Sequence, residues 1–142
     1  MRKFLGMAAA FALMFVTVPA VLAQDAPMEI KGAKTVNADA VVELIKQTSN
    51  LVILDNRSDA DYKAGSIKGA VRLIDTDITG EAVLAQHVKS KDTPILFYCN
   101  GLKCGRAAKA SVMAIGWGYK NVYYYALGME EWKQRSLPLV TH

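Results

Sequence analysis

The sequence predicts an α/β fold, with a mainly parallel central sheet flanked by helices on both faces. Residues 51–54 and 95–98 are short runs without polar alternation, which is typical of strands buried on both faces. Helical patterns separate the predicted strands, as the crossover connections of a parallel sheet require. Residues 24–142 are long enough for a single domain with one core.

The N-terminus has the pattern of a cleavable signal peptide. Residues 1–23 include 18 apolar residues. Arg2 and Lys3 precede the main apolar run, and Pro19 interrupts it. The apolar run is shorter than the roughly 20 residues of a membrane-spanning helix, so we expect cleavage after Ala23 rather than an anchor. The mature protein is therefore expected in a bacterial periplasm, without further membrane attachment.

Charge excludes one class of partner. Without Arg2 and Lys3, 15 basic and 13 acidic residues leave a net charge of +2. No basic stripe is interleaved with aromatic residues, so a nucleic-acid partner is not expected.

The first half of the mature chain begins with a polar lead-in over residues 24–34, and the domain is expected over residues 35–142. Asn37 is a helix cap, followed by apolar residues at helical spacing from Val41 to Ile45. The buried strand 51–54 follows. Residues 55–67 are expected as a loop or a short helix, 70–73 as a brief strand and 81–88 as a helix.

The second half repeats the strand and helix alternation. The buried strand 95–98 ends at Cys99, and a glycine-containing loop over 100–105 leads into a helix over 106–115. Residues 122–125 form a third long strand, whose tyrosine rings are expected to alternate between its faces. A last helix begins near Gly128, contains Trp132 and ends before Pro138.

Cys99 is the candidate nucleophile, because ligands of open α/β sheets bind at the carboxyl ends of strands. Backbone N–H groups of the loop and the dipole of the following helix favour a thiolate, so we expect Cys99 to have a lowered pKa and to be reactive. Lys103 and Arg106 add positive charge for an anionic substrate. The alternative is a small core residue at the end of a strand, which is the common role of a buried cysteine.

Metal and cofactor chemistry is not indicated by the two cysteines. Cys99 and Cys104 have four residues between them, whereas redox dithiol motifs have two, and neither His87 nor His142 is near them in sequence. A zinc site requires four ligands at recognisable spacing. We therefore expect neither a metal nor a cofactor.

Three segments together resemble single-domain rhodaneses, which are sulfurtransferases with one catalytic cysteine. The active-site loop is matched by residues 98–107, Tyr-Cys-Asn-Gly-Leu-Lys-Cys-Gly-Arg-Ala. An upstream motif is matched by Asp55-Asn56-Arg57 through Tyr62 and by residues 65–70, and a C-terminal motif by residues 128–132 and Leu137-Pro138. The similarity extends from about Thr35 to Val140.

The resemblance implies that Cys99 accepts sulfur from a small anionic donor such as thiosulfate and becomes a persulfide. A thiol or cyanide-type acceptor, or a protein, then takes the sulfur. The resemblance also implies a cradle for that sulfur formed by Asn100, Gly101, Leu102, Lys103, Cys104 and Gly105, with Arg106 beside it. Asp55 and Arg57 are expected to pair and brace the loop, although Arg57 could instead contact the donor.

The sequence departs from the family pattern in several places. Ser66, Leu127 and Ser136 replace common family residues, which leaves the chemistry intact. In many family loops an arginine stands where Cys104 is, and here Arg106 follows two residues later. Six residues separate Cys99 from Arg106, whereas related phosphatases and arsenate reductases have five, so we do not expect their chemistry.

The role of Cys104 is left open by the sequence. It could be an inert loop residue, a thiol that attacks the Cys99 persulfide, or the partner of Cys99 in a disulfide that silences the enzyme. Two alternatives to a sulfurtransferase also stay open. One is a non-catalytic module that carries sulfur or binds a partner, and the other is a thiol–disulfide protein that uses both cysteines.

Overall fold

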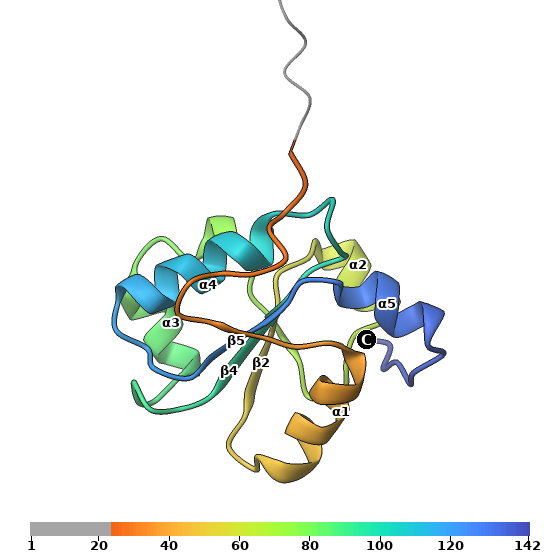
Figure 1. The fold of residues 1–142 in the computed structure, drawn as a ribbon, viewed down its shortest axis with the longest axis horizontal. Helices are drawn as coiled ribbons and strands as arrows, with labels where there is room; N and C mark the ends of the chain where they lie inside the picture. Colours follow the sequence, from red (N-terminus) through yellow and green to blue (C-terminus); the bar gives the residue numbers. More distant parts are fainter. Residues whose placement is uncertain (1–23) are drawn as a thin grey trace, which may run out of the picture.

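The computed structural model describes residues 24–142, and the signal peptide expected over residues 1–23 lies outside the described residues. A five-stranded, all-parallel sheet carries helices on both faces, which confirms the predicted fold class (Figure 1). The strands are β1 (Lys34–Thr35), β2 (Val52–Asp55), β3 (Val71–Arg72), β4 (Ile95–Tyr98) and β5 (Val122–Tyr125). The helices are α1 (Ala38–Gln47), α2 (Asp59–Ala64), the short 3₁₀ helix η1 (Asp75–Asp77), α3 (Glu81–His87), α4 (Arg106–Gly116) and α5 (Gly128–Gln134).

The helix starts follow local capping chemistry. The Asn37 side chain accepts a hydrogen bond from Ala40 N at 2.9 Å, so the predicted cap of α1 is confirmed. Ser58 caps α2 in the same way through Asp61 N, and the segment 55–67 therefore contains a short helix. The 3₁₀ helix η1 was not expected, because three residues carry no periodic signal.

The strand order places the two motif-bearing strands side by side. The order is β1-β5-β4-β2-β3, so the chain leaves β2 toward β3 and leaves β4 toward β5, in opposite directions. The sheet therefore has its topological switch between β2 and β4, and such crevices are where open α/β sheets bind ligands. Asp55 ends β2 beside Tyr98, which ends β4, and Cys99 follows directly.

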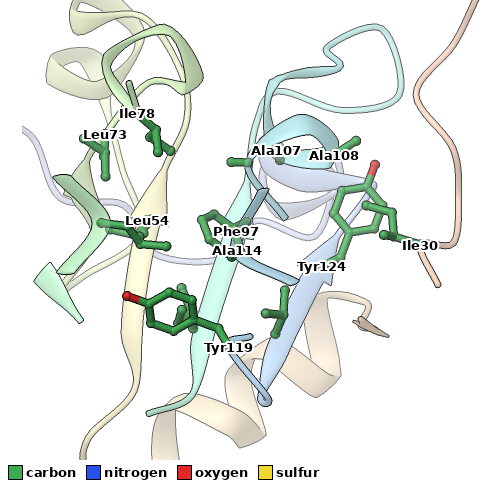
Figure 2. Close-up of a cluster of buried hydrophobic side chains, with 14 of the residues drawn as sticks. Ile30, Leu54, Leu73, Ile78, Phe97, Ala107, Ala108, Ala114, Tyr119 and Tyr124 are labelled. Carbon is green, nitrogen blue, oxygen red and sulfur yellow. The ribbon is translucent and has the colours of Figure 1, made fainter. Parts of the chain in front are cut away.

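Side chains of the central strands alternate between two cores. Leu54, Phe97 and Tyr124 pack toward α3 and α4, as Figure 2 shows for the cluster around α4. Ile53, Leu96, Tyr98 and Tyr125 pack on the other face, against α1 and α5. The predicted alternation of the tyrosine rings in β5 is confirmed.

The segment expected as a lead-in packs on the domain. Ile30 is buried in the core on the α4 face, and the Tyr124 hydroxyl donates to Pro27 O at 2.8 Å. Lys34 and Thr35 add β1 to the edge of the sheet beside β5, although both are exposed and polar. Within residues 24–142, no helix is long and apolar enough to cross a membrane.

Candidate functional site

Cys99 lies at the carboxyl end of the central strand β4. Its side chain points to the same face of the sheet as that of Phe97 and lies in the same core cluster, on the face that α4 covers. Its Sγ lies 4.0 Å from Asn56 O, which follows β2. The two loops expected to build the site thus meet at the switch point of the sheet.

Cys99 and Cys104 form a disulfide in the structure. Their Cα atoms are 6.2 Å apart, and the loop is closed by a hydrogen bond from Cys104 N to Gly101 O at 3.0 Å. Cys99 is only 2% exposed, whereas Cys104 is half-buried at the surface. The state described here is therefore the disulfide that the sequence left open, and not the accessible thiolate that we expected. The physical reason is that the turn at Gly101 brings Cys104 back over Cys99.

The N-terminus of α5 fixes the backbone of Cys99. Met129 N donates to Cys99 O at 2.9 Å, and Glu130 N donates to Asn100 O at 2.8 Å. Gly128 permits this approach, because it has a φ of +54° and a Cβ at this position would lie 2.2 Å from Cys99 O. The C-terminal motif therefore holds the loop after β4 through backbone contacts.

Asp55 and Arg57 form a buried ion pair behind the loop. The Arg57 guanidinium donates to both carboxylate oxygens of Asp55, at 2.9 and 2.7 Å, and to Gly65 O at 2.7 Å. Burial alone would lower the pKa of Arg57, but the hydrogen bond and charge of Asp55 outweigh it, so the pKa is raised. Arg57 is 1% exposed, and its charge is directed at Asp55 rather than at the surface.

Tyr98 connects this pair to β4. Its hydroxyl donates to Asp55 Oδ2 and accepts a hydrogen bond from Ile67 N at 3.3 Å. Burial and the negative charge of Asp55 both raise the pKa of Tyr98, so the hydroxyl stays protonated. Sequence reasoning missed Tyr98 and Asn56 as parts of the site, although both lie within segments that carried the resemblance.

The outer face of the loop borders an open pocket of about 320 Å³. The residues that line it are Asn100, Lys103, Cys104, Gly105 and Arg106. Gly105 precedes α4 without a side-chain cap, and the first turn of this helix has no acidic residue. The uncapped end of the helix and the Arg106 side chain make this pocket favourable for an anion.

Two neighbouring segments hold the loop from the sides. The Asn100 amide donates to Asp61 Oδ2 at 3.2 Å, and this hydrogen bond is the main cause that lowers the pKa of Asp61. Lys103 pairs with Asp25 at 2.6 Å, which raises the pKa of Lys103. Ala26 N donates to Leu102 O at 2.6 Å, so the lead-in also contacts the loop. The charge of Lys103 is therefore shared with Asp25.

Among residues 24–142, no three His, Cys, Asp or Glu side chains gather as a group that could hold a metal ion.

Comparison with known proteins finds relatives by sequence and similar folds among solved structures. The chain is 28% identical over 108 residues to the uncharacterized protein YibN of Escherichia coli K12, covering 75% of this chain and 72% of YibN. It is 29% identical over 109 residues to the tRNA uridine(34) hydroxylase of Hamiltonella defensa, covering 72% of this chain but only 30% of that protein.

Among solved structures, the polysulfide-sulfur transferase of Wolinella succinogenes superposes with a TM-score of 0.63 at 20% identity, covering 79% of this chain and 81% of that one. The thiosulfate sulfurtransferase of Pseudomonas aeruginosa gives a TM-score of 0.66 at 18% identity, covering 78% of this chain and 21% of that one. These two likenesses concern the fold. The model of the rhodanese-like domain matches residues 37–135, which include the loop, the buried ion pair and the start of α5, and the chain therefore belongs to the rhodanese-like family.

Proposed function

We propose that the protein is a sulfurtransferase that carries sulfane sulfur on Cys99. The observation that carries the proposal is the position of Cys99 Sγ, at the end of the central strand and bonded to a second sulfur in the loop before α4. A sulfur atom bound to Cys99 therefore fits within this loop. Family membership and the fold shared with two sulfur transferases support the same chemistry.

The reaction begins with the reduced loop. The Cys99 thiolate attacks the outer sulfur of a thiosulfate-type anion, the S–S bond of the donor breaks, and sulfite leaves with the bonding electrons. Backbone N–H groups of residues 100–105 and the start of α4 stabilise the negative charge of the persulfide. A thiol, a cyanide-type nucleophile or a protein then accepts the sulfur.

The supporting residues hold the loop rather than react. Asp55, Arg57 and Tyr98 keep the ends of β2 and β4 together, while Arg106 attracts the anionic donor. No residue is needed as a general base, because the nucleophile is already a thiolate.

The test is thiocyanate formation from thiosulfate and cyanide by the reduced, purified protein, with a mercapto-acid as second donor. Cys99→Ser should abolish both thiocyanate formation and the release of sulfite from thiosulfate. Cys104→Ser should retain thiocyanate formation, because cyanide takes the sulfur directly. A reduced protein that forms no thiocyanate with either donor, and that releases no sulfite from thiosulfate, would contradict the proposal.

The disulfide itself favours a second candidate, a thiol–disulfide protein that uses Cys99 and Cys104. That function needs both cysteines, so Cys104→Ser would abolish it as completely as Cys99→Ser. A non-catalytic module would form no thiocyanate in the parent protein, although one that carries sulfur would still release sulfite as Cys99 takes the sulfur.

We also propose that the protein works in the periplasm after cleavage at Ala23. N-terminal sequencing of the protein from a periplasmic extract should begin at Gln24. Recovery of the full-length chain from the cytoplasmic fraction alone would contradict this location.

A further inference from the structure

We propose that Cys104 resolves the Cys99 persulfide, so that the enzyme releases hydrosulfide and its co-substrate is a dithiol reductant. The inference rests on the proposed persulfide chemistry and names the fate of its sulfur. In this scheme the first acceptor is part of the enzyme's own loop, and the disulfide in the structure is an intermediate of the cycle.

The geometry of the loop supports an internal reaction. Cys104 reaches Cys99 while β4 and α4 stay formed on either side, and while the turn bond from Cys104 N to Gly101 O at 3.0 Å is kept. α5 holds the other end of the loop through Cys99 O and Asn100 O. Because both sulfurs are attached to one short, braced loop, Cys104 is present at a high effective concentration that an external thiol must exceed.

The resolving step needs no reactant besides the Cys99 persulfide, the Cys104 thiolate and a proton. The Cys104 thiolate attacks Cys99 Sγ, a bond forms between the two cysteine sulfurs, and the bond from Cys99 Sγ to the terminal sulfur breaks. The terminal sulfur leaves with the electron pair and takes a proton as hydrosulfide. The two cysteines are oxidised to a disulfide, and the sulfane sulfur is reduced to sulfide.

The unequal exposure of the two sulfurs decides how the disulfide is reopened. Cys99 is 2% exposed, whereas Cys104 lines the open pocket beside Lys103 and Arg106. An incoming thiolate therefore reaches Cys104 and expels the Cys99 thiolate. The mixed disulfide then stands on Cys104, and a second thiol of the reductant must displace it. A dithiol does this within one molecule, which is why the partner belongs to that class.

The experiment is a single turnover with thiosulfate under anaerobic conditions, after the reductant used to open the disulfide has been removed. Sulfite, hydrosulfide and the masses of peptides with Cys99 and Cys104 are measured without any added acceptor. The parent protein should release one sulfite and one hydrosulfide per chain and end as the disulfide. Cys104→Ser should release sulfite, retain the persulfide on Cys99 and give no hydrosulfide, and Cys104→Ala should behave likewise.

Failure of this inference differs from failure of the proposed function. A parent protein that keeps its persulfide, with Cys104 still free, would overturn the resolving role and leave the sulfurtransferase intact. Hydrosulfide release from Cys104→Ser at the rate of the parent protein would also overturn it. Absence of sulfite from the parent protein and from Cys104→Ser would instead overturn the persulfide chemistry itself.

Discussion

Arg57 shows how a single charged residue can serve the site from inside the core. Its guanidinium is almost fully buried against Asp55, with a further hydrogen bond to Gly65 O. A buried charge that loses its partner costs several kcal/mol, because the remaining charge stays out of water. The pair therefore fixes the segment after β2 that contacts Cys99 Sγ through Asn56 O.

Arg57→Met should lower the free energy of unfolding by about 3–5 kcal/mol, because it leaves the buried Asp55 carboxylate without its cation. Urea unfolding measures this change. The control is Arg135→Met, which removes an exposed pair with Asp39 and should have little effect. Equal effects of the two substitutions would show that the buried pair is not the brace described here.

At the scale of elements, the starts of two helices lie against the loop that contains Cys99 and Cys104 in different ways. α5 donates backbone N–H groups to the carbonyls of Cys99 and Asn100. α4 begins without a side-chain cap beside the pocket that Cys104 and Arg106 line. The hydrogen bonds from α5 hold the loop in position, whereas the start of α4 places partial positive charge beside the pocket.

Gly128→Ala should displace the loop, since its Cβ would lie 2.2 Å from Cys99 O. The left-handed backbone alone costs an alanine about 1–2 kcal/mol, and the overlap adds to this loss of stability. Urea unfolding and sulfite release in a single turnover should both be impaired. Gly116→Ala is the control, because nothing lies within 4 Å of its Cβ position. Unimpaired sulfite release by Gly128→Ala would argue against the role of α5.

Arg106→Gln should slow sulfite release from thiosulfate about fivefold at low salt, which corresponds to ~1 kcal/mol for a partly exposed charge. The difference should shrink as ionic strength rises, because salt screens the attraction. Lys120→Gln removes a charge just before the amino end of β5, whereas Cys99 follows the carboxyl end of the parallel strand β4, so it should leave the rate unchanged. A salt-independent loss in Arg106→Gln would mean that Arg106 does not act through its charge.

At the scale of the whole molecule, the apolar core clusters stabilise the fold, and the disulfide makes only a small further contribution to its stability. Two apolar clusters lie on opposite faces of the sheet, and most of their members lie outside the loop, which contributes Cys99, Leu102 and Cys104 to the first cluster. The bridge joins residues only five positions apart, so it restricts little of the unfolded chain. Opening it is therefore compatible with an intact domain, as the proposed cycle requires.

Reduction of the disulfide should lower the free energy of unfolding by only about 2 kcal/mol, the value for so short a loop. Urea unfolding with and without a phosphine reductant measures the difference. The double variant Cys99→Ser/Cys104→Ser should not respond to the reductant. Unfolding of the parent protein on reduction alone would show that the bridge is structural and would argue against a cycle through it.

The order of residues along the chain was sufficient to predict β2, β3, β4 and β5 and the main helices. Strands such as 95–98 are buried on both faces, and a continuous run of apolar residues in the sequence indicates this burial. Capping at Asn37 and the alternation of Tyr123 to Tyr125 are local properties of the same kind. They depend on neighbours a few residues away, so the sequence by itself determined them.

The tertiary structure decided the features that depend on distant segments. β1 is a two-residue polar strand that exists only because β5 lies beside it, so it carries no pattern of its own. Arg57 could have faced a donor or Asp55, and the packing of β2 against β4 decided this. The contact of Gly128 with Cys99 and the bond between Cys99 and Cys104 arise in the same way, because the folded chain brings together backbone and sulfur atoms whose distances no local pattern encodes.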